Sequence, residues 1–81
     1  MRVTVVKADG VVCVDGVCMG GIAMVSLAPT LHAMQWYGDH GEEEHRDPVT
    51  RRQTNVQISL LDGYAEVLAQ WGAMTGEPVM E

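Results

Sequence analysis

Phenylalanine is absent from this 81-residue chain, and its aromatic residues are two tryptophans and two tyrosines. Trp36, Trp71, Tyr37 and Tyr64 therefore supply the aromatic part of any core, with six methionines as adaptable filling. A chain this short buries only a little over about 60% of its unfolded surface. We expect one domain over residues 1–76 and a frayed C-terminal tail at 77–81.

Basic residues are also scarce, with five lysines and arginines against eleven acids and a net charge of −6. From Gln53 to the end the chain has four acids and no base. This balance argues against sequence-independent binding to nucleic acid or to an anionic membrane. The one basic cluster, Arg46, Arg51 and Arg52, lies close to Glu42–Glu44, so we expect a salt-bridged, solvated loop there rather than a phosphate site.

No long hydrophobic run is present. The longest uncharged segment, Gly16–Tyr37, contains Pro29, His32 and Gln35, which makes it a poor membrane span. The N-terminus has the pattern of a strand and not of a secretion signal. We therefore expect a soluble protein that stays in the cytoplasm.

The first quarter of the chain has the pattern of a three-stranded meander. Arg2–Val6, Val11–Val14 and Val17–Met19 are short runs rich in β-branched residues, which favours strands. Asp15-Gly16 between the second and third run is the strongest hairpin signal of the chain and predicts a type I′ turn.

A second hairpin is predicted in the middle of the chain. His32–Tyr37 alternates along its length, which puts His32, Met34 and Trp36 on one face of a strand. The turn Gly38–Gly41 leads into a returning strand, Glu42–Arg46. Asp47–Thr54 is polar and contains a proline, so it reads as a loop before a short strand, Val56–Ile58.

The best helix signal begins at Ser59, where Ser59–Asp62 has the form of a capping box. An apolar stripe follows at helical spacing, and Asp62, Glu66 and Gln70 are expected to face outward. The residues of the stripe are Leu60, Leu61, Tyr64, Val67, Leu68 and Trp71. The helix should end near Gly72–Gly76. We predict an α+β fold, an antiparallel meander of two or more β-hairpins packed against one C-terminal amphipathic helix.

The two cysteines fall opposite each other in the predicted first hairpin. Cys13 and Cys18 can bind a metal, form a cross-strand disulfide or pack as small apolar groups, and we favour packing as free thiols. His40 and His45 have the same spacing as the cysteines, so an alternative is a small zinc-stapled binding domain that uses all four side chains.

Acidic residues and histidine gather around the second turn. Asp39, His40 and Glu42–Glu44 invite an acid–base or calcium interpretation, but a turn flanked by glycine offers neither burial nor a fixed partner. The spacing of an EF-hand is absent, as are the sequence motifs of hydrolases, nucleotide-binding loops and zinc proteases. We therefore expect a non-enzyme with no cofactor.

Adjacent aromatic residues suggest a contact surface. Trp36 and Tyr37 must point to opposite sides of a strand, so one can lie under the helix while the other faces solvent or a partner. The residues that we single out for interaction are Trp36, Tyr37, Asp39, His40 and Glu43.

The chain resembles a group of small uncharacterised proteins of tailed phages and prophages. The resemblance rests on Val14-Asp15-Gly16, a turn at Leu27-Ala28-Pro29, the string His32-Ala33-Met34-Gln35-Trp36, the acidic return Gly41–Glu44 and Trp71. It covers most of the chain, and only the His-Ala-x-Gln-Trp string is specific. It implies a gene near tail or tail-fibre genes and assigns no catalytic residue.

The expected function is that of a phage or prophage accessory or structural protein that acts by protein–protein contact. Its partner would be a second copy of itself, as a dimer, or another phage structural protein such as a tail component, in the cytoplasm of the bacterial host. A further alternative is an acidic decoy of a host nucleic-acid-binding protein, suggested by the acidic segment from Gln53 onward.

Overall fold

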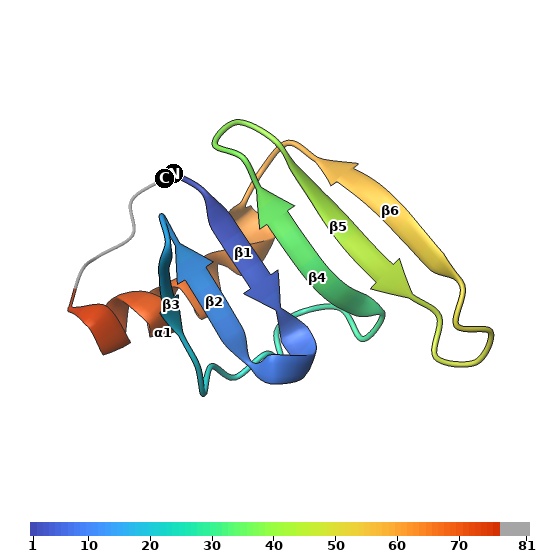
Figure 1. The fold of residues 1–81 in the computed structure, drawn as a ribbon, viewed down its shortest axis with the longest axis horizontal. Coiled ribbons are helices and arrows are strands. Elements are labelled where there is room, and N and C mark those ends of the chain that lie inside the picture. Colours follow the sequence, from blue (N-terminus) through green and yellow to red (C-terminus); the bar gives the residue numbers. More distant parts are fainter. Residues whose placement is uncertain (77–81) are drawn as a thin grey trace.

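Six strands form one antiparallel sheet in the computed structural model, which describes residues 1–76 (Figure 1). The spatial order is β3-β2-β1-β4-β5-β6, and one helix, α1 (Ala65–Thr75), packs against the sheet. The strands are β1 (Val3–Val6), β2 (Val11–Val14), β3 (Val17–Met19), β4 (Leu31–Trp36), β5 (Gly41–Arg46) and β6 (Gln53–Ile58). The predicted α+β fold is confirmed. The predicted tail, 77–81, lies outside the described residues.

The first meander forms as the sequence predicts. Asp15 and Gly16 both have positive φ angles, 48° and 86°, as a type I′ turn requires. A short 3-10 turn, Lys7–Asp9, joins β1 to β2. The alternate valines of β1 and β2 point to one face and form the centre of the core; these are Val3, Val5, Val12 and Val14.

The fourth strand contains an irregularity that the sequence pattern did not reveal. Leu31 pairs with His45 and Ala33 pairs with Glu44, so His32 is an extra residue in β4. Because of this bulge, Leu31 and not His32 takes the core position before Met34, and Leu31 is buried. The prediction that His32 shares a face with Met34 is therefore wrong.

The sixth strand starts earlier than predicted. Gln53, Thr54 and Asn55 belong to β6, and only 47–52 connects it to β5. Polar residues hold this strand in register, because the side-chain amides of Asn55 and Gln57 donate to the Glu42 carboxylate at 3.3 and 2.8 Å. The polarity that suggested a loop belongs to a strand exposed on both faces.

The C-terminal helix starts later than predicted. The chain needs Ser59–Leu61 to return from β6, and a 3-10 turn at Asp62–Tyr64 precedes α1. No side-chain hydrogen bond caps either helical segment, so the capping-box prediction is wrong, and Leu60 is exposed. The rest of the apolar stripe is confirmed as buried, and α1 ends at Thr75 with the left-handed Gly76 behind it.

The long loop between β3 and β4 closes the core from one side. Ile22, Met24 and Leu27 are buried against the sheet and the helix. The side-chain amide of Gln70 accepts from the Ala23 N–H at 2.8 Å and donates to the Ala23 carbonyl at 2.9 Å. Gln70 therefore ties α1 to this loop instead of facing outward, which corrects the prediction.

The helix covers only part of the sheet. α1 contacts β2 and β3, and β5 and β6 extend away from it (Figure 1). The indole N–H of Trp71 donates to the Val17 carbonyl at 2.9 Å, which fixes α1 to β3. No helix within residues 1–76 combines the length and the apolar character that a membrane span needs.

Candidate interaction surface

The residues singled out for interaction do not form one surface. Trp36 is 7% exposed and belongs to the core, next to Gly41 across the β4–β5 turn, so we remove it from the candidate surface. Glu43 is half-buried on the helix-facing side of β5. Tyr37, Asp39 and His40 lie together in the turn between β4 and β5.

This turn is well organised. The Tyr37 N–H donates to the His40 carbonyl at 2.8 Å, and the two rings lie 5.3 Å apart. The Arg2 guanidinium lies 5.6 Å from the centre of the Tyr37 ring, within range of a cation–π contact. The His40 ring bonds Asp39 at 2.5 Å, and this hydrogen bond holds the Asp39 pKa below its ordinary value. Whether the turn binds a partner stays a prediction.

A polar chain of four residues connects three elements on the helix-facing side of β5. The Tyr64 hydroxyl donates to Glu43 Oε2 at 2.6 Å, and His45 Nε2 bonds Glu43 Oε1 at 3.0 Å. His45 Nδ1 bonds the Thr30 hydroxyl at 2.9 Å. The sequence placed Glu43 and His45 on one face of the strand, and the structure shows this. It also adds Tyr64 and Thr30, which no local sequence signal identifies.

The chain of hydrogen bonds shifts the titration of its carboxyl and phenol groups. Partial burial by itself raises the Glu43 pKa, but the hydrogen bonds from Tyr64 and His45 and the charge of His45 outweigh it and hold that pKa below its ordinary value. Burial, followed by the bond to Glu43, raises the Tyr64 pKa. Glu43 is thus ionised and paired at neutral pH, and its partner Tyr64 lies directly before the start of α1.

Thr30, His45 and Glu43 place a hydroxyl, an imidazole and a carboxylate in the same sequence of hydrogen bonds that catalytic triads use. Here the second oxygen of Glu43 accepts a hydrogen bond from the buried Tyr64. The carboxylate therefore contributes to the packing of the domain as well as to the orientation of His45. We interpret the chain as a polar tie between the 3-10 turn at Asp62–Tyr64, β5 and the loop before β4.

The cysteines correct two expectations. Cys13 and Cys18 face each other on β2 and β3, with Cα atoms 3.9 Å apart, and form a disulfide. Their pairing across the hairpin was predicted, but the favoured packing as free thiols is wrong, because the two sulfurs are bonded to each other. The zinc alternative with His40 and His45 is also wrong, because both thiols are used in the disulfide. Residues 1–76 contain no group of three or more His, Cys, Asp or Glu that could hold a metal ion.

The two edges of the sheet differ. β3 has three residues, carries the disulfide, and has its Val17 carbonyl bound by Trp71. β6 has six residues, five of them exposed and none charged. Natural proteins protect edge strands by shortness, lysine, proline, bulges or cover, and β6 has none of these over Gln53–Ile58. The sequence signal that could have identified it is the run without charge or proline from Gln53 to Leu61.

Comparison with known proteins gives no relative. Neither the protein-family models nor the curated proteins nor the solved structures searched contain a match to this chain. Its function therefore has to be argued from its own residues.

Proposed function

We propose that this protein is a non-catalytic interaction module that pairs with a second copy of itself through the β6 edge. The observation that carries the proposal is the open edge of β6, six residues long, uncharged and free of the features that block pairing. Alternate residues of an edge strand direct their N–H and C=O groups away from the sheet, where another strand can bind them.

A second copy is the partner that this edge fits. Antiparallel pairing of β6 with itself has two-fold symmetry, so both copies use the same surface and the assembly closes as a dimer. It also brings the Arg51–Arg52 end of one strand towards the Ser59–Asp62 end of the other, where the basic and acidic side chains attract. No charged side chain within β6 opposes a like charge across the two-fold axis.

The biological setting that we propose is a phage or prophage accessory or structural protein, as the sequence resemblance implies. The protein would be made in the cytoplasm of its bacterial host. Because disulfides persist in oxidising surroundings, the bond between Cys13 and Cys18 favours a working place outside that cytoplasm, such as an assembled particle. The acidic-decoy alternative stays a prediction, because no observation on the described residues bears on it.

The test is sedimentation velocity over a concentration series with a charge placed in the edge. Val56 is 42% exposed near the middle of β6, so Val56→Lys puts two like charges close together in the dimer and should abolish association. Val56→Thr keeps a neutral, β-branched side chain and should retain it. Val25→Lys is the matched control, because Val25 is 90% exposed and lies in the loop between β3 and β4.

Ionic strength supplies a second readout. Each copy carries a net charge of −6, so long-range repulsion opposes the dimer, and added salt should strengthen association by screening it. A wild-type protein that stays monomeric at all concentrations, or a dimer that survives Val56→Lys unchanged, would contradict the proposal. If a different phage structural protein copurifies and the chain does not associate with itself, the partner is that protein, and the proposal of a second copy is overturned.

A further inference from the structure

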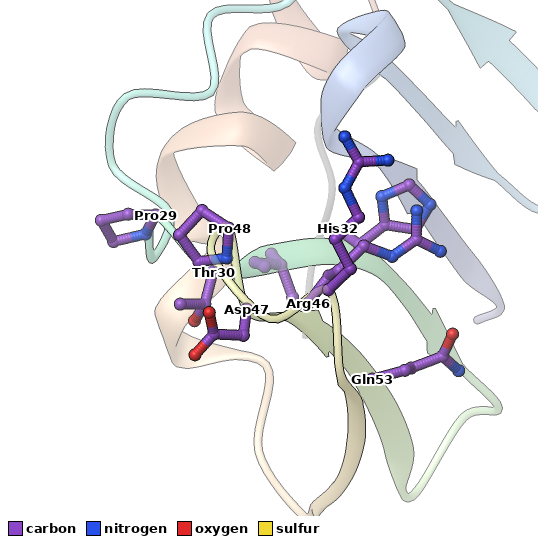
Figure 2. Close-up of a pocket in the computed structure, with 9 residues that line it drawn as sticks. Pro29, Thr30, His32, Arg46, Asp47, Pro48 and Gln53 are labelled. Atoms are coloured by element: carbon purple, nitrogen blue, oxygen red, sulfur yellow. The ribbon is translucent and has the colours of Figure 1, made fainter.

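The loop between β5 and β6 and the bulge of β4 enclose a surface depression of about 470 Å³ (Figure 2). A binding site here would be separate from the proposed function, because one chain supplies all its lining residues, whereas pairing through β6 needs two chains. Its polar lining comes from three strands and two connecting loops, and it includes Thr30, His32, Arg46, Asp47, Arg51 and Gln53. Pro29, Leu31 and Pro48 complete the wall.

The arginine side chains of this depression form no salt bridge with a carboxylate of the described residues. Within residues 1–76 the charged contacts between basic and acidic side chains are His40–Asp39 and His45–Glu43, and no arginine takes part in one. The expected salt-bridged loop is therefore wrong. In a protein of net charge −6, Arg46 and Arg51 remain together with His32 around one hollow.

The backbone holds this arrangement in place. The Asp47 N–H donates to the Arg52 carbonyl at 3.0 Å, and the Arg51 N–H donates to the Asp47 carbonyl at 2.9 Å. Asp47 Oδ1 accepts from the Val49 and Thr50 N–H groups at 2.8 and 3.0 Å, which lowers the Asp47 pKa. One oxygen of Asp47, whose carboxylate lines the depression, therefore accepts hydrogen bonds from the backbone of its own loop.

Three local features place basic residues in the wall of the depression. The bulge makes His32 an extra residue of β4, and bulges commonly re-aim a side chain beside a functional site. Arg51 has a φ of 61°, a left-handed conformation that residues other than glycine adopt only when the surrounding structure requires it. Arg46 is fixed by its N–H, which donates to the Thr30 carbonyl at 2.8 Å.

We propose that this depression binds the phosphate group of a small phosphate monoester. Two guanidinium groups, the His32 imidazole and the Gln53 amide offer donors from several directions, which suits a tetrahedral oxyanion. The volume exceeds that of phosphate alone and leaves room for an attached organic group. The overall negative charge of the protein opposes binding, so affinity should be modest and fall with added salt.

The experiment is a titration followed by ¹H–¹⁵N NMR, with inorganic phosphate and phenyl phosphate as probes. Saturable shifts should centre on His32, Arg46 and Arg51, with phenyl phosphate the tighter ligand. Arg51→Gln should weaken binding about tenfold, the loss of one charge-assisted contact, and Arg51→Lys should recover only part of it, because lysine cannot bind in a bidentate manner.

Arg52→Gln is the matched control. It removes the same charge from the same loop, but Arg52 does not line this depression. Arg52 lines a neighbouring hollow with His45 and Thr54, and the two hollows share Thr30, Arg46 and Asp47. Equal weakening by Arg52→Gln and Arg51→Gln would show non-specific attraction and overturn the proposal, as would shifts that do not saturate. Sedimentation of the Arg51→Gln and Arg52→Gln proteins keeps this result separate from self-association, because each variant loses one charge from the Arg51–Arg52 end of the strand and both should change association equally.

Discussion

The two halves of the sheet are built from the same antiparallel ladder but are stabilised differently. The half formed by β1, β2 and β3 lies with β4 under α1 and the β3–β4 loop, and its core valines are almost completely buried. The half formed by β5 and β6 extends beyond the helix and is held by cross-strand polar contacts and by the Tyr64–Glu43–His45 chain. Buried packing is therefore concentrated in the first half, and the surface that we propose for self-association lies in the second.

Removing the helix anchor should give the largest effect. Trp71 is 4% exposed and bonds Val17, so Trp71→Ala creates a cavity and leaves a carbonyl unpaired. We expect a loss of about 3–5 kcal/mol in the free energy of unfolding, close to the whole stability of so small a domain. Met74→Ala, at a side chain 45% exposed on the same helix, is the control and should change little. Urea denaturation measures both, and equal losses would contradict the account.

Gly41 lies where the covered half gives way to the open one. A Cβ there would meet the Gln35 carbonyl oxygen at 2.7 Å and Trp36 Cε3 at 2.8 Å. Gly41→Ala should therefore lose about 1–3 kcal/mol by overpacking, with a changed Trp fluorescence spectrum. Gly63→Ala, where a Cβ has no neighbour within 4 Å, is the control. A fully stable Gly41→Ala protein would show that β4 and β5 can separate more easily than we infer.

The disulfide protects the edge of the covered half. Changing both Cys13 and Cys18 to serine should lower the free energy of unfolding by about 2 kcal/mol, because the bond closes only a short loop. The fold should survive, since α1 still holds β3 through Trp71 and Val17. Thermal unfolding of the double variant, beside wild type with and without reductant, measures the effect. Complete unfolding on reduction would show that the core cannot hold β3 alone.

Glu43→Gln tests the polar tie of the open half and should have the smallest effect, about 1 kcal/mol at neutral pH. The folded-state Glu43 pKa lies below its ordinary value of 4.5. The ionised carboxylate therefore stabilises the fold above that pH, and its contribution is lost as the pH falls through the folded pKa. Glu43→Gln should flatten this acid dependence in thermal unfolding from pH 7 downward.

Glu44→Gln is the control for Glu43→Gln, because no hydrogen bond from a described residue reaches the Glu44 carboxylate. Its unfolding profile should follow wild type. If the two variants lose stability in parallel as the pH falls, the hydrogen bonds of Tyr64 and His45 do not govern the acid dependence.

Local patterns predicted the first meander well, because Asp15-Gly16 and the alternating valines act within one hairpin. The stripe from Leu61 to Trp71 likewise predicted the buried face of the helix. The start of α1 was missed because Ser59–Leu61 must cross from β6 to the helix, a requirement set by the tertiary fold.

The candidate sites were less predictable. The bulge at His32 depends on how β4 pairs with β5, and the Thr30–His45–Glu43–Tyr64 chain joins residues far apart in the sequence. The first residues of β6, Gln53 and Thr54, were predicted as loop because polar residues in an edge strand exposed on both faces carry no alternation of burial. Of the residues singled out for contact, Trp36 is buried in the core, because a small domain without phenylalanine needs the apolar volume of its tryptophans there.

The most direct test of the account is amide hydrogen exchange of the two edge strands, measured residue by residue at low and high protein concentration. Pairing through the open edge predicts that alternate amides of β6 gain protection as concentration rises, while those of β3 do not change. Protection gained at β3, or concentration-independent exchange in both strands, would contradict the claim that the uncovered half of the sheet is the binding half.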